Sequence, residues 1–117
     1  MKKSLTSADK IALKSEFDYI RAEGKKYVAG CVLLVVAPSP DGKLRCGVVC
    51  GKKYSNSAVK RNRARRLLWE SFRLLKSQIG PAHCIMIPRR RIAVLKQPDV
   101  QKALNYLFRK AGLIEDC

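Results

Sequence analysis

Residues 45–72 read RCGVVCGKKYSNSAVKRNRARRLLWESF, and this stretch decides the fold. The apolar run over residues 44–50 predicts a strand, and residues 51–56 follow as a basic loop. Ser55, Asn56 or Ser57 can cap a helix that we expect over residues 57–77. The stretch therefore predicts a strand and a helix joined by a short basic connection.

The expected helix carries one apolar stripe at spacings of four, four, three and four residues. The stripe consists of Ala64, Leu68, Phe72, Leu75 and Ile79. Gly80-Pro81 follows and predicts the end of the helix. We expect the stripe to face a sheet.

Three further elements are expected outside this stretch. A helix is predicted over residues 10–23, firmly from about residue 15, and a buried strand over residues 27–37. Asp41-Gly42 in the turn at 38–42 is a hairpin signal, so residues 44–50 are expected to return beside the preceding strand. Residues 84–87 predict a last strand.

The final helix is expected to begin near Pro98-Asp99 and to end near Ala111. Its inward positions are Val100, Ala103, Leu104, Leu107 and Phe108. The order is then a helix, two or three strands, a helix, a strand and a helix. This order predicts an α+β fold, a two-layer α-β sandwich, in one domain over residues 1–117 with residues 1–9 as a loose lead-in.

The charge of the chain points to a polyanionic partner. The net charge is +16, with 25 Lys and Arg against 9 Asp and Glu, and no acidic residue occurs between Gly42 and Trp69. Nucleic acid is the first partner class and an acidic membrane surface the second. The longest purely apolar run, residues 31–37, is too short to span a membrane. We expect a cytoplasmic protein.

The helix over residues 57–77 is the candidate nucleic-acid interface, because arginine binds phosphate through paired donors. On a helical wheel, Asn62, Arg66, Trp69 and Arg73 lie opposite the core stripe, whereas Arg61 and Arg65 lie nearer the core. The expected contacts from the helix are Lys60, Arg61, Asn62, Arg63, Arg65, Arg66, Trp69 and Arg73. Replacing Arg61, Arg63 and Arg66 together is expected to leave the fold intact. The alternatives are a solvated basic face and, for Trp69, packing against a neighbouring loop.

Enzyme signatures are sparse, and we expect no catalytic residue and no metal ligand on the chain. His83 is the only histidine and is expected to be structural. Five cysteines, Cys31, Cys46, Cys50, Cys84 and Cys117, show no metal-binding spacing. They are expected to be reduced thiols, buried except for the terminal one.

A family resemblance rests on several of these segments. Residues 45–53 (RCGVVCGKK), Arg61-Asn62-Arg63, Arg65-Arg66 and residues 70–73 (ESFR) resemble the protein subunit of bacterial ribonuclease P. The resemblance implies a left-handed βαβ crossover, like that of the second domain of ribosomal protein S5. It also implies an RNA subunit that carries the active site, uses Mg²⁺ and removes the 5′ leader of precursor tRNA.

The resemblance also implies two RNA-binding surfaces. Lys52 and Lys53, together with Arg61, Asn62, Arg63, Arg65 and Arg66, match the motif that contacts the catalytic RNA. The leader cleft lies between the first helix and the sheet, where Phe17, Arg21 and Arg45 are the expected contacts.

The expected partners are therefore the catalytic RNA and precursor tRNA, with no protein partner evident. A ribosomal or other structural RNA-binding protein without a part in tRNA processing is the alternative function. An autonomous nuclease is the third.

Overall fold

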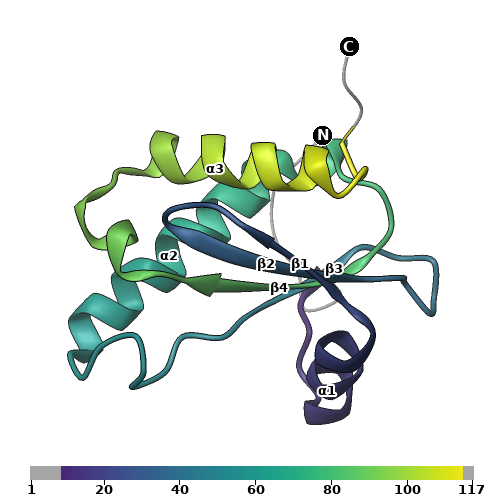
Figure 1. Cartoon of the computed structure of the whole chain (residues 1–117), viewed down its shortest axis with the longest axis horizontal. Helices are drawn as coiled ribbons and strands as arrows, with labels where there is room; N and C mark the ends of the chain where they lie inside the picture. The colour runs from purple at the N-terminus through teal and green to yellow at the C-terminus, as the bar shows by residue number, and fades with distance from the viewer. Residues whose placement is uncertain (1–8, 115–117) are drawn as a thin grey trace.

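A mixed four-stranded sheet organises residues 9–114, the part of the chain that the computed structural model describes (Figure 1). The elements in chain order are α1 (Lys14–Glu23), β1 (Lys25–Val28), β2 (Val32–Ala37), β3 (Arg45–Val48), α2 (Ala58–Leu75), η2 (Lys76–Gln78), β4 (His83–Pro88), η3 (Arg90–Val94) and α3 (Gln97–Lys110). The predicted α+β class and order of elements are confirmed.

The strand order is β1-β2-β4-β3, with β3 parallel to β4 and the other two pairings antiparallel. Parallel neighbours need a crossover connection, and α2 provides it. The expected pairing of residues 44–50 with the preceding strand is wrong, because β4 lies between β2 and β3. Gly42 adopts the positive φ of a tight turn, at +72°, but the turn connects strands that do not touch each other.

The apolar run at 27–37, predicted as one strand, forms two strands. β1 and β2 pair across a tight connection at residues 29–31, where the Ala29 N–H donates to the Val32 carbonyl at 2.9 Å. Gly30 is the only residue of the run that favours a turn. The hairpin places Tyr27 opposite Leu34.

The main core lies between the sheet and the layer formed by α2 and α3. The predicted stripe is buried as expected, from Ala64 to Leu75 within α2 and at Ile79, which follows η2. Val100, Leu104, Leu107 and Phe108 of α3 are fully buried, and Ala103 packs at the margin. Cys31, Cys46, Cys50 and Cys84 are free and buried, which confirms their expected role as small apolar residues, whereas Cys117 lies outside the described residues. Desolvation raises the pKa of the Cys84 thiol to about 12.

The opposite face of the sheet carries α1 (Figure 1). Ile11 and Ile20 pack there against Val35, Ala37 and Ile85. The helix begins at Lys14, close to the predicted firm start, and the Leu13 N–H donates to Glu16 Oε1 at 3.1 Å. Because α1 is short, it covers only part of this face.

Phe17 of α1 lies directly on the backbone of β3 at Gly47. A Cβ atom on Gly47 would stand 2.7 Å from Cε1 of Phe17 and 3.2 Å from Cβ of Ile11. A glycine inside a strand can mark a place where another segment approaches the backbone closely, and at Gly47 that segment is α1.

The beginning of β3 is held by a polar cluster centred on Asp41. Asp41 accepts from the Lys43 N–H at 3.1 Å and contacts Arg45 at 3.1 Å and His83 Nε2 at 3.3 Å. Arg45 also reaches Glu16 at 3.5 Å. The backbone hydrogen bond from Lys43 is the largest cause that lowers the Asp41 pKa to about 2, with the Ser39 hydroxyl, His83 and Arg45 adding to it. His83 is buried in this cluster, in the structural role expected for it.

We predict that Gly47→Ala destabilises the protein by about 1–3 kcal/mol, because the new methyl group overlaps Phe17 and forces α1 to move. Urea denaturation measures the free energy of unfolding. Gly51→Ala is the matched control, because a Cβ atom there meets no described atom within 4 Å. Equal stability of the two variants would contradict the close packing of Phe17.

We predict that Asp41→Asn removes one acid-dependent part of the stability. The folded pKa of Asp41, about 2, lies below its ordinary value of 3.8, so the ionised carboxylate stabilises the fold above about pH 4. This contribution is lost as the pH falls towards 2. Urea denaturation between pH 6 and pH 2 should show a smaller decline for Asp41→Asn than for wild type. Asp18→Asn, at an exposed position on α1, should decline as wild type does.

Candidate nucleic-acid interface

The first turns of α2 concentrate positive charge at a helix N-terminus. Ser57 caps the helix, its hydroxyl accepting from the Lys60 N–H at 3.3 Å, and no acidic residue stands in the first turn. Free N–H groups and the helix dipole add a partial positive charge at this end. The basic side chains that follow divide into two groups, according to whether they bind the protein backbone.

Arg61 and Arg65 hold the loop that precedes α2. Arg61 Nη1 donates to the Ser55 carbonyl at 2.8 Å, and Arg65 Nη2 donates to the Cys50 carbonyl at 2.6 Å. The two arginines thus fix the loop on either side of residues 51–54. Both are half-buried, in agreement with their predicted place near the core.

Arg63 holds the segment that follows β4. Its guanidinium donates to the carbonyls of Ile92 at 3.3 Å, Ala93 at 3.2 Å and Leu95 at 2.6 Å. A guanidinium has five donors in a fixed plane and can join several carbonyls at once. Arg61 and Arg63 therefore have structural roles, which argues against the expectation that their replacement would leave the fold intact.

The remaining cations of this region point to solvent. Lys52, Lys53, Lys60 and Arg66 are exposed, and their side chains make no hydrogen bond or ion pair with other residues in the range 9–114. Asn62 is exposed beside them and accepts a long hydrogen bond, 3.4 Å, from Arg65. We call these four cations and Asn62 the outer basic face, and its cations can bind a polyanion without first breaking a hydrogen bond or ion pair within the described residues.

Arg73 and Trp69, which the helical wheel places on the open outer face, both make contacts within the protein. Arg73 pairs with Glu70 through two nitrogens, so that part of its charge is neutralised. Trp69 is half-buried, and its ring stands edge-on to Phe72, with 6.1 Å between the two ring centroids. Lys10 Nζ lies over the Trp69 ring, 4.9 Å from the ring centroid. Trp69 therefore packs between the outer face and the core instead of standing on the open face.

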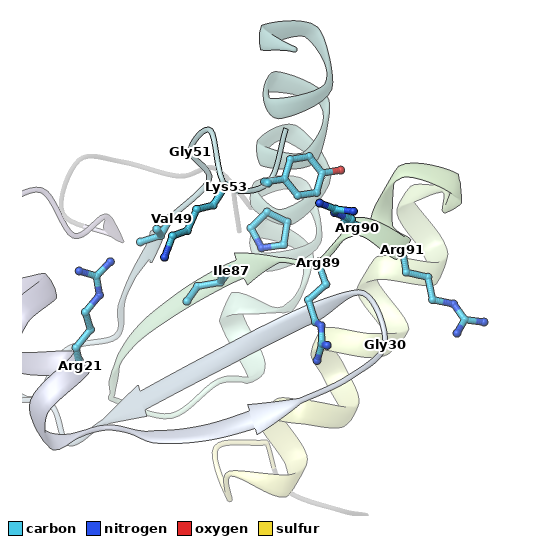
Figure 2. Close-up of a pocket in the computed structure, with 11 residues that line it drawn as sticks. Arg21, Gly30, Val49, Gly51, Lys53, Ile87, Arg89, Arg90 and Arg91 are labelled. Atoms are coloured by element: carbon cyan, nitrogen blue, oxygen red, sulfur yellow. The ribbon is translucent and has the colours of Figure 1, made fainter. Parts of the chain in front are cut away.

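A groove of about 650 Å³ opens on the part of the sheet that α1 leaves uncovered (Figure 2). Its apolar floor is formed by Val49 and Ile87, and Pro88 and Tyr54 also line it. Five cations stand around it: Arg21 from α1, Lys53 from the loop before α2, and Arg89, Arg90 and Arg91 after β4. Figure 2 shows Lys53 and Arg21 extending towards each other across Val49, while Arg91 points outward.

The groove continues along α1 towards the end of β3. Phe17, Arg21 and Asp18 line this part together with Val48 and Val49. Phe17 and Arg21, two of the expected cleft residues, therefore stand in one groove. An apolar floor with cationic walls suits single-stranded nucleic acid, in which bases contact apolar surface and phosphates contact the rim.

Arg45, the third expected cleft residue, is not among the described residues that line this groove. It stands at the first residue of β3, whereas the groove lies at the other end of the strand. Its charge is taken up by Asp41 and Glu16. Sequence alone could not show the contact with Glu16, because it forms only when α1 docks on the sheet.

The groove also contains residues that the sequence analysis did not select. Arg89, Arg90 and Arg91 follow β4 directly, and the Arg89 N–H donates to the Cys31 carbonyl at 2.9 Å, which ties this run to the β1–β2 hairpin. The signal in the sequence was a run of three arginines immediately after a buried strand. Tyr54, an aromatic that stands beside basic residues in the sequence, also lines the groove.

The structure offers neither a metal site nor a membrane-spanning helix within residues 9–114. In that range no three His, Cys, Asp or Glu side chains are grouped so that they could hold a metal ion. No helix of the described chain is long and apolar enough to cross a membrane.

Comparison with known proteins identifies the family. The family model described as Ribonuclease P matches residues 5–112. The ribonuclease P protein component of Synechococcus sp. (strain RCC307) is 33% identical over 112 residues, covering 85% of this chain and 88% of the relative. That of Roseiflexus castenholzii is 30% identical, covering 92% of this chain and 89% of the relative.

Solved structures show the same fold. The RNase P protein of Thermotoga maritima superposes with a TM-score of 0.75 at 26% identity, covering 92% of this chain and 98% of that protein. The RNase P protein of Staphylococcus aureus gives a TM-score of 0.81 at 24% identity, covering 93% and 100%. The chain belongs to the ribonuclease P protein family.

Proposed function

We propose that this chain, as the protein component of ribonuclease P, binds the catalytic RNA through its outer basic face and the 5′ leader of precursor tRNA in the groove. The observation that carries the proposal is the groove on the open sheet face, with Phe17, Val49 and Ile87 beneath Arg21, Lys53 and Arg90. Membership of the family decides between the two predicted classes of RNA-binding protein in favour of ribonuclease P.

The RNA and protein subunits have different roles, in agreement with the side chains that this chain presents. Cleavage of the RNA chain takes place on the RNA subunit, and the protein subunit supplies binding. His83, the only histidine, is buried beside Asp41 away from the groove. Mg²⁺ is expected with the RNA subunit, where it would supply charge stabilisation for phosphate chemistry. The cytoplasmic location expected from the sequence belongs to the same proposal.

The physical contribution of the protein is electrostatic and geometric. Two RNA molecules that approach each other repel through their phosphates, and a chain of net charge +16 reduces that repulsion. The groove adds discrimination, because a precursor has a single-stranded leader to place in it and a mature tRNA has none. Binding should therefore favour the precursor.

We predict that the holoenzyme reconstituted from this protein and its RNA cleaves precursor tRNA at low Mg²⁺, and that it binds precursor more tightly than mature tRNA.

Arg89→Ala/Arg90→Ala should weaken precursor binding about 10-fold, from two phosphate contacts of up to about 1 kcal/mol each, and leave mature tRNA binding unchanged. Lys102→Ala/Lys110→Ala removes the same charge from α3 and controls for net charge. Equal weakening for both tRNAs would contradict the groove as the leader site, and no stimulation of cleavage by the wild-type protein would contradict the proposed function.

We predict opposite outcomes for two arginines of α2. Arg66→Ala should weaken binding of the catalytic RNA and reduce the slope of log affinity against log salt by about 1, with the urea midpoint unchanged. Arg63→Ala should lower the free energy of unfolding by about 2–3 kcal/mol, because three carbonyls lose a charged donor. Binding titrations from 50 to 200 mM salt and urea denaturation of both variants separate the roles. A stable Arg63→Ala variant, or an Arg66→Ala variant with an unchanged slope, would contradict this assignment.

A further inference from the structure

Tyr54 stands at the boundary between two recesses of the surface. One is the groove on the open sheet face, which Tyr54 lines together with Lys53 and Arg90. The other is a notch of about 240 Å³ lined by Tyr54, Ser55, Lys60, Arg90 and Ala93, between the loop before α2, the first turn of α2, and η3. Since Tyr54 and Arg90 belong to both recesses, the groove continues past them to the N-terminus of α2.

The backbone that carries Tyr54 is fixed on both sides. The Tyr54 N–H donates to the Gly51 carbonyl at 3.0 Å and closes a turn. Arg65 holds the Cys50 carbonyl before this turn, and Arg61 holds the Ser55 carbonyl after it. The side chain is half-buried with its inner part against the main core. A ring held in this way loses little conformational freedom when a ligand binds to it.

The surroundings of the ring define the chemistry of a ligand. Lys53, Lys60 and Arg90 bring three positive charges into the two recesses, and no acidic residue lines either of them. Desolvation raises the pKa of the Tyr54 phenol, so the ring is neutral at physiological pH. A neutral aromatic ring among cations fits a unit that has a flat π-system between phosphates, which is a nucleotide within a single strand.

We propose that Tyr54 stacks on a nucleobase of a single RNA strand that passes from the groove to the N-terminus of α2, with Lys53, Lys60 and Arg90 on the flanking phosphates. The inference rests on the proposed function and adds to it a stacking residue between the two RNA-binding surfaces. The base belongs either to the leader of precursor tRNA or to the catalytic RNA, since both approach this point.

The test compares Tyr54→Leu with Tyr54→Phe in the reconstituted holoenzyme. Leucine keeps an apolar side chain against the core but has no ring, whereas phenylalanine keeps the ring. Tyr106→Leu is the matched control, because Tyr106 is a 52% exposed tyrosine on α3, with Lys110 Nζ 5.3 Å from its ring centroid. Urea denaturation of each variant measures any loss of packing separately from loss of binding.

One arm of the experiment uses precursor tRNA with a single abasic nucleotide placed at successive leader positions. Stacking predicts that Tyr54→Leu weakens precursor binding about 5-fold or more, that Tyr54→Phe does not, and that Tyr106→Leu does not. At one leader position the abasic nucleotide should weaken wild type by a similar factor and should not weaken Tyr54→Leu further. Such non-additivity reports a direct contact, which a purely structural role of Tyr54 would not produce.

The second arm measures the affinity of each variant for the catalytic RNA alone. A loss of about 5-fold or more for Tyr54→Leu in this arm, at an unchanged urea midpoint and restored by phenylalanine, assigns the base to the catalytic RNA. Unchanged affinity of Tyr54→Leu in both arms overturns the inference, as does a loss that phenylalanine does not restore. If wild type itself fails to prefer precursor over mature tRNA, the proposed function fails instead.

Discussion

Mutual repulsion among the basic side chains of α2 is the constraint that shapes this protein. The chain offsets it by giving backbone carbonyls to three of the arginines as acceptors. Arg61 and Arg65 bind the loop before α2, and Arg63 binds the segment after β4. These hydrogen bonds hold the loop just before α2 and a segment about 30 residues further along the chain against the N-terminal half of α2. The charge that disfavours a compact state is thereby used to position the loops that carry the groove.

This arrangement separates two kinds of positive charge that composition cannot distinguish. Arginines bound to carbonyls are part of the framework, and exposed cations such as Lys60 and Arg66 remain available to a partner. The framework also places Lys53, Tyr54 and Arg90 at the rim of the groove. In the proposed function, the leader and the catalytic RNA would therefore bind to adjoining surfaces that share one set of structural arginines.

The features that were predicted correctly from the sequence are those that periodicity and local composition encode. The stripe from Ala64 to Leu75 follows from helical spacing alone, and the basic outer face follows from it. The hydrogen bonds of Arg63 could not be predicted, because the acceptor carbonyls lie about 30 residues away and a backbone carbonyl has no signature in the sequence. The β1–β2 connection was hidden because Gly30 is the only break in an apolar run. The ion pair of Arg45 with Glu16 depends on α1 packing beside β3, which the local sequence does not encode.

The central position of β4 has a consequence for the order in which the molecule is assembled. During synthesis, the hairpin of β1 and β2 and the separate strand β3 emerge first, and each keeps an unpaired edge until residues 83–88 join them. The carbonyls that accept from Arg63 emerge later still, at residues 92–95. A nascent chain that has completed α2 already has most of its positive charge but not the framework that orients it. The proposed selective contact with RNA therefore requires the residues that follow β4, which emerge after most of the positive charge.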